Sequence, residues 1–112
     1  LNLLNRLEHV MAYYLVQGKA INELLTELRQ RLDSGEIRVM KPFGQALQYG
    51  LDHARLQENG TAIWEEEDYC VPPLAQERAA IIDTYFKELT VEPVEKTEGW
   101  KRIEPLPMLW QD

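Results

Sequence analysis

The chain has 112 residues, of which 45% are apolar and 28% are charged, a composition typical of one globular domain with a single core. Its 19 acidic and 12 basic residues give a net charge of −7, which disfavours binding to nucleic acid or to anionic lipid. No apolar run approaches the roughly 20 residues that a membrane-spanning helix requires.

Cysteine usage indicates a reducing compartment. Cys70 is the only cysteine, so the chain cannot form an internal disulfide. We find no secretory signal pattern, and the paired cysteines and histidines of common zinc sites are absent. We therefore expect a cytoplasmic protein with no cofactor and no metal site.

The first half of the chain predicts a strand followed by a helix. Residues 1–10 fit a short amphipathic helix, or a leader or extension if Met11 is the natural start. The segment 13–19, YYLVQGK, is rich in β-forming residues and predicts the first strand. Asn22 can cap a helix that ends at Gly35 and carries apolar residues at helical spacing, namely Leu24, Leu25, Leu28 and Leu32.

The pattern between residues 36 and 51 is weaker. Alternating apolar residues over 37–40 indicate a short extended piece. A second short helix is expected from about Pro42, with its apolar face formed by Phe43, Ala46, Leu47 and Leu51.

Asn59 and Gly60 predict the turn of a β-hairpin because this pair adopts positive φ readily. A two-residue loop would put Trp64 on the opposite face from Leu56. A three-residue loop over 58–60 instead gathers the apolar side chains on one face, namely Ala54, Leu56, Ala62 and Trp64. We prefer the three-residue loop because a one-residue slip would invert the faces of the strand.

Pro73 predicts the start of a long helix over about 73–87, since proline suits the first helical turn. Its apolar stripe would consist of Leu74, Ile81, Ile82, Tyr85, Phe86 and Leu89. A fourth strand is expected over 89–92, and Pro93 favours an edge position for it.

Residues 96–112 form an apolar C-terminal arm in which Pro105 and Pro107 oppose a regular helix. An arm this apolar is poorly soluble if it is left free. We expect it to dock in an extended form on its own domain or on a neighbouring subunit.

Together these elements give the βαββαβ order of a ferredoxin-like fold over residues 11–95, with one short helix inserted. This order predicts an α+β protein in which two helices cover one face of a four-stranded antiparallel sheet. Several apolar side chains cannot all point toward those helices, namely Tyr13, Leu15, Trp64 and Val91. The second face of the sheet therefore needs a cover.

The opening MAYYLVQGK and this element order are similar to those of the dimeric α/β-barrel proteins, which include antibiotic-biosynthesis-type monooxygenases. The resemblance implies that two such sheets pack face to face in a homodimer. The block WEEEDYCVPPLAQER resembles a feature of a small bacterial family, to which we attach no activity.

Cys70 and the acidic run at 65–68 are the first candidates for chemistry. A helix start can lower a thiol's pKa, but the acids disfavour a thiolate and no histidine is near, so we interpret Cys70 as buried and structural. The acids could bind a hard cation. Because neighbours along a strand point to opposite faces, we expect a solvated edge instead. We interpret Glu77 and Arg78 as helix-end charges.

For function we expect a homodimeric binding or structural module with no cofactor. The alternative is a cofactor-independent oxygenase or isomerase that acts on a small apolar or aromatic molecule. The candidate residues are, for catalysis, His53, Glu66 and Tyr69 and, for ligand binding, Trp64 and Tyr85. A regulatory module that binds a ligand without a reactive group is a third possibility. His9 carries little weight because it lies in the possible leader.

Overall fold

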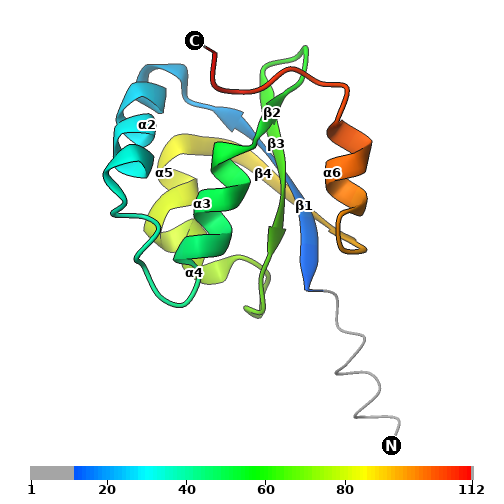
Figure 1. Cartoon of the computed structure of the whole chain (residues 1–112), viewed down its shortest axis with the longest axis horizontal. Helices are drawn as coiled ribbons and strands as arrows, with labels where there is room; N and C mark the ends of the chain where they lie inside the picture. The colour runs from blue at the N-terminus through cyan, green and yellow to red at the C-terminus, as the bar shows by residue number, and fades with distance from the viewer. Residues whose placement is uncertain (1–11, 112) are drawn as a thin grey trace, which may run out of the picture.

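A computed structural model of the protein describes residues 12–111, and it contains one antiparallel sheet of four strands in the order β2-β3-β1-β4 (Figure 1). The predicted α+β class and four-stranded antiparallel sheet are confirmed. The prediction for 1–10, including His9, lies outside the described residues. The strands are β1 (Tyr13–Ala20), β2 (Arg55–Leu56), β3 (Thr61–Glu67) and β4 (Phe86–Val94).

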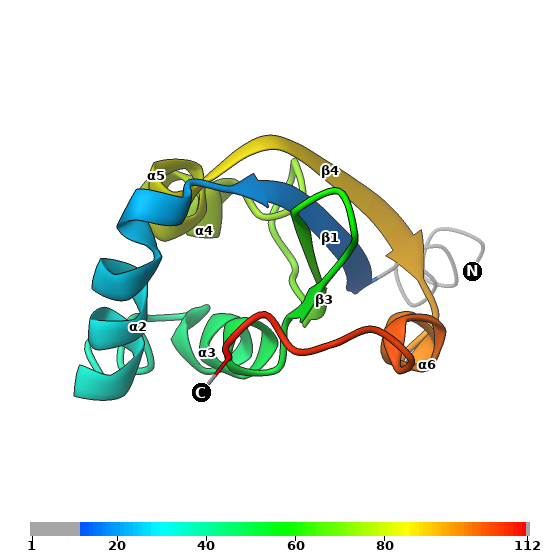
Figure 2. The ribbon, with the colours of Figure 1, turned by 90° about the horizontal axis from the view of Figure 1, so that it is seen from above.

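Most of the helical structure lies on one face of the sheet, and α6 (Glu98–Ile103) lies on the other (Figure 2). The first group consists of a 3₁₀ turn η1 (Asn22–Leu24), α2 (Leu25–Ser34), α3 (Gly44–Asp52), α4 (Ala75–Glu77), a π-helical turn η2 (Arg78–Ile82) and α5 (Asp83–Tyr85). The main core lies between this group and the sheet. Within residues 12–111, no helix is long and apolar enough to cross a membrane.

The hairpin has the predicted three-residue loop. Leu56 pairs with Ala62, and the amide of Gln57 donates to the carbonyl of Thr61 at 2.9 Å, so residues 58–60 form the turn. Gly60 has a φ of +83°. Ala54, Ala62 and Trp64 are fully buried in the main core, with Leu56 packed against it, so the preferred register is confirmed.

Replacing Gly60 by alanine should test the turn geometry in isolation. A Cβ at this position would meet no atom within 4 Å, so the only cost is the left-handed backbone. We expect the free energy of unfolding to fall by about 1 kcal/mol. Urea denaturation of Gly60→Ala beside the exposed control Glu58→Ala measures this cost, and equal stability of Gly60→Ala and the parent chain would contradict the assignment.

The first helix ends as predicted but begins differently. Gly35 has a φ of +86° and its amide donates to Leu32, as a left-handed terminator does. Asn22 lies inside η1 and provides no side-chain cap. Residues 37–40 form turns rather than an extended piece, because the carbonyl of Ile37 accepts the amide of Met40 and the carbonyl of Met40 accepts that of Gly44. The short helix expected from Pro42 begins at Gly44.

The long helix predicted over 73–87 is shorter at both ends. It begins at Ala75, because Leu74 adopts a left-handed φ of +65°. It ends at Tyr85, because Phe86 pairs with Ala20 in the sheet. The helical spacing of Phe86 and Leu89 was therefore misleading, and these residues belong to β4. The edge position that Pro93 predicted for this strand is confirmed.

The second face of the sheet is covered by the chain itself. Ile103 of α6 packs against three apolar side chains on this face, namely Leu15, Ile63 and Val94. Glu65 points to the same side, where its carboxylate accepts the amides of Thr97 at 2.9 Å, Gly99 at 2.8 Å and Trp100 at 3.2 Å. This carboxylate therefore fixes the start of α6. Within residues 12–111, α6 therefore covers the part of this face that motivated the homodimer prediction.

The C-terminal arm continues from α6 along the edge of β2. The amide of Leu56 donates to the carbonyl of Pro107, and the amide of Leu109 donates to that of Ala54, both at 2.8 Å. Leu109 then enters the main core, and the indole of Trp110 donates to the carbonyl of Leu51 at 2.7 Å. The arm thus packs on its own chain, although it contains a helix where we predicted an extended segment.

Candidate functional site

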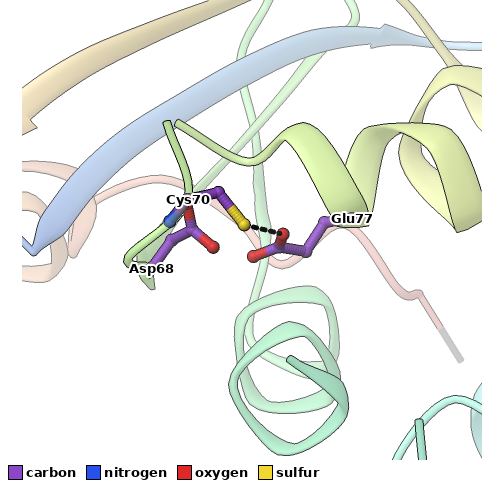
Figure 3. Close-up of side chains that lie close together, drawn as sticks. All are labelled: Asp68, Cys70 and Glu77. Atoms are coloured by element: carbon purple, nitrogen blue, oxygen red, sulfur yellow. Dashed lines mark hydrogen bonds between the residues drawn. The ribbon is translucent and has the colours of Figure 1, made fainter. Parts of the chain in front are cut away.

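Three carboxylic acids are buried together where β3 leaves the sheet. Glu66, Asp68 and Glu77 are only 1%, 5% and 0% exposed. Asp68 and Cys70 lie in the loop after β3, and Glu77 faces them from α4 (Figure 3). The predicted solvated edge is therefore wrong for these acids, and Glu77 is not a helix-end surface charge.

Asp68 organises the loop that carries the site. Its Oδ2 accepts the amide of Cys70 at 3.0 Å and the amide of Leu74 at 2.6 Å. These bonds close the loop and hold Leu74 in its left-handed conformation immediately before α4. Burial raises the pKa of Asp68, but the adjacent Glu77 carboxyl and the two amides outweigh it and lower the pKa overall.

Glu66 lies behind the loop, on the main-core face of β3. Its Oε1 accepts the indole proton of Trp64 at 2.9 Å, whereas its buried Oε2 meets no N–H or hydroxyl donor among the described residues. Burial raises the pKa of Glu66 well above its ordinary range, and the neighbouring Glu77 and Asp68 raise it further. The buried site therefore favours the neutral form of Glu66 more than water does.

Glu77 sits between the other two acids. Its Oε1 lies 3.8 Å from Sγ of Cys70, and its buried Oε2 meets no N–H or hydroxyl donor within residues 12–111. Burial, followed by a hydrogen bond with Asp68, raises the pKa of Glu77 to about 7, although a hydrogen bond with Glu66 acts in the opposite direction. The cluster thus holds one ionised acid, Asp68, beside a carboxyl group close to its titration midpoint.

Cys70 is half-buried rather than fully buried as we predicted. A backbone hydrogen bond from Gln76 lowers its pKa, but burial and the charge of Asp68 outweigh this effect and raise it. The thiol is therefore protonated at neutral pH. By itself it is a poor nucleophile.

An open pocket of about 720 Å³ borders the cluster. Its apolar side comes from the turn before α3 and the first turn of α3, and its polar side comes from the loop after β3 and from α4. The lining residues are Pro42, Phe43, Gln45, Ala46, Glu67, Asp68, Tyr69, Cys70 and Gln76. Asp68 and Cys70 thus connect this pocket with the buried acids.

The structure does not bring His53, Glu66 and Tyr69 together. They line three different pockets, and the ring of His53 stacks on Tyr49 while its Nδ1 contacts the carbonyl of Tyr49 at 2.8 Å. Tyr69 is 72% exposed at the main pocket, and its hydrogen bond to Glu67 raises its pKa to about 12.

Trp64 and Tyr85, the candidate ligand-binding residues, are fully buried in the main core. Trp64 supports the site indirectly through its bond to Glu66, and the Tyr85 hydroxyl donates to Glu27 at 2.5 Å.

Sequence reasoning weighed Asp68 as a cation ligand but preferred a solvated edge, and it interpreted Glu77 as a helix-end charge, although part of the signal for a buried site was present. Alternation along β3 places Glu66 on the same face as Trp64, and a tryptophan in the core predicts a buried neighbour two residues away. The position of Glu77 depends on the left-handed Leu74 and could not be read from periodicity.

Comparisons with protein-family models, with curated proteins and with solved structures gave no match.

Proposed function

We propose that the protein is a binding module for a small cationic ligand, which occupies the open pocket between α3 and the loop after β3. The observation that carries the proposal is the asymmetry of this pocket. One side presents Pro42, Phe43 and Ala46, and the other presents Asp68 and Cys70 in front of two further buried acids. A ligand with an apolar body and a positive group matches both sides.

Electrostatics supports a cation rather than an anion. Within residues 12–111, the ion-pair partners of the arginines and lysines are other acids, and none is Glu66, Asp68 or Glu77. The site also belongs to a chain with a net charge of −7. A positive group placed beside Asp68 would relieve the mutual repulsion of the buried acids.

We rank binding ahead of catalysis. The oxygenase or isomerase considered from the sequence needs reactive groups that converge on one substrate. His53 lines a different pocket from Tyr69, and the raised pKa of Tyr69 opposes its use as a base near neutral pH. Glu66 alone of the three candidates belongs to the acid cluster.

The architecture is consistent with a ferredoxin-like core, because two βαβ halves with the strand order β2-β3-β1-β4 interleave in that fold. We infer this fold for residues 13–94, with α6 and the arm as an addition. The proposal does not need a homodimer, since α6 occupies the face that a second sheet would use.

Binding of benzylamine and of benzoate should differ, because the two molecules share a ring and carry opposite charges. We expect weak, saturable binding of benzylamine, with shifts in the amide NMR signals of Ala46 and Cys70, and no such shifts with benzoate. Asp68→Asn should weaken benzylamine binding at least fivefold, and Ala46→Leu should weaken it by filling the apolar side. Equal effects of the two molecules would contradict a cation site.

A further inference from the structure

We infer that the acid cluster beside this pocket also holds a divalent transition-metal ion, with Asp68, Cys70 and Glu77 as its ligands and the fourth coordination position open to the pocket. The inference rests on the proposed function only in its choice of a cation, and it adds an inorganic ion as a second occupant of the site. The site consists of the Asp68 carboxylate from the loop after β3, the Glu77 carboxylate from α4 and the only thiol of the chain (Figure 3).

The spacing of the donor atoms suits one small ion. A carboxylate oxygen of Asp68, Sγ of Cys70 and a carboxylate oxygen of Glu77 all lie within 4.8 Å of one another. The distance of 3.8 Å between Sγ and Glu77 Oε1 is close to the roughly 3.5 Å that separates two ligands of a tetrahedral zinc ion. Small rotations of the three side chains would bring their donor atoms within bonding distance of one ion.

The unpartnered oxygens are an independent sign of an occupant. Oε2 of Glu77 and Oε2 of Glu66 are buried and meet no N–H or hydroxyl donor among the residues that the structure describes, so only a proton shared between the acids, or an ion, can satisfy them. A buried acceptor without a partner costs roughly 1–3 kcal/mol, and such groups in a native fold call for an explanation such as an ion. An ion beside Glu77 would satisfy its free oxygen directly.

The thiol selects the type of metal. Magnesium and calcium prefer all-oxygen sites, whereas zinc and cobalt accept a thiolate together with carboxylates. Three protein ligands with one open position resemble the arrangement of zinc sites that bind a further molecule. Here the open position faces the pocket, because Asp68 and Cys70 both line it.

The surroundings of the donor atoms favour a preorganised site. The amides of Cys70 and Leu74 fix the Asp68 carboxylate, and the indole of Trp64 fixes Glu66 next to Glu77. Such supporting hydrogen bonds orient ligands before the ion arrives.

Metal binding must release protons. The thiol of Cys70 gives up its proton when the sulfur coordinates, and a carboxyl group that is protonated before the ion binds does the same. The three ligands then carry three negative charges against two positive charges. No oxidation or reduction takes place.

Calorimetric titration of the tag-free full chain with zinc chloride tests the inference. We expect one zinc ion per chain and the release of at least one proton, that of the Cys70 thiol, measured from the heats in two buffers of different ionisation enthalpy. Cobalt should bind with a thiolate-to-metal absorption band, and magnesium should not compete.

Three variants locate the ion. Glu77→Gln and Cys70→Ser should each weaken zinc binding at least tenfold, and Cys70→Ser should abolish the cobalt charge-transfer band. Glu58→Gln is the control, because Glu58 is an exposed acid in the hairpin turn away from the pocket, and it should bind zinc like the parent chain. Zinc affinity that is unchanged in both Glu77→Gln and Cys70→Ser would overturn the inference.

Benzylamine binding to chelator-treated protein separates this inference from the proposed function. If benzylamine binds and zinc does not, the metal inference fails and the cation pocket stands. If neither binds, both fail.

Discussion

A chain that ends at Glu95 should lose at least about 5 kcal/mol of its free energy of unfolding, which is comparable with the whole stability of a small domain. The deletion removes Ile103 and Leu109, each less than 10% exposed, and uncovers Leu15, Ile63 and Val94 on the second face of the sheet. Burial of each such side chain contributes roughly 1.5–3 kcal/mol. Circular dichroism with urea denaturation should show a chain that is unfolded or barely folded.

Point variants keep this prediction testable if the shortened chain does not fold. Leu109→Ala should lower the free energy of unfolding by about 2–4 kcal/mol, because it leaves a cavity in the main core. Lys101→Ala, on the exposed side of α6, is the control, and its free energy of unfolding should lie within about 0.5 kcal/mol of that of the parent chain. A shortened chain with the stability of the parent would show that α6 is dispensable, and its sedimentation would then reveal whether a second copy covers the face.

The metal-free protein should lose stability between pH 5 and pH 8, by an amount on the order of 2 kcal/mol. Burial raises the pKa of Glu77 from 4.5 to about 7 and raises that of Glu66. In this range the folded state therefore binds more protons than the unfolded state, and stability falls as pH rises. The lowered pKa of Asp68 does not oppose the trend, since its contribution is lost only below its ordinary value of 3.8.

Glu77→Gln should reduce this pH dependence and make the chain more stable than the parent at pH 8. The amide keeps the shape of the side chain and removes the buried charge that faces Asp68, Glu66 and Cys70. Glu67→Gln, at an exposed position, should leave the dependence of the free energy of unfolding on pH unchanged. Urea denaturation with a chelator present measures the effect, and a Glu77→Gln variant with the parent's slope would contradict the account.

Local patterns predicted the parts of the fold that local physics determines. The turn at Gly60 and the alternation around Trp64 were enough to choose the hairpin register, because the wrong register would expose the tryptophan. Gly35 likewise marked a helix end that needs a positive φ.

Long-range contacts decided what the sequence did not predict. The helix before β4 stops at Tyr85 because β1 offers pairing partners to the residues that follow. The arm folds over the second face because α6 starts at a carboxylate, Glu65, that lies more than thirty positions earlier in the chain. Neither contact has a periodic signature, and the second supplies a cover for the sheet face that had motivated the homodimer prediction.

The candidate site was hidden for a related reason. Alternation along a strand sends neighbouring side chains to opposite faces, and on that ground the run of four acids at 65–68 predicts a solvated edge. Burial of Glu66 and Asp68 depends on the loop closed by the amides of Cys70 and Leu74, and on Glu77 arriving from α4. The geometry of this loop is a tertiary property.

The most direct test of the cation site is a crystal structure of the full chain grown with zinc, with diffraction measured on both sides of the zinc absorption edge. We predict one anomalous peak within bonding distance of Sγ of Cys70 and of carboxylate oxygens of Asp68 and Glu77. The crystals should be grown at a zinc concentration that saturates other known zinc proteins. The absence of a peak between the three intact side chains under that condition would contradict the cation site.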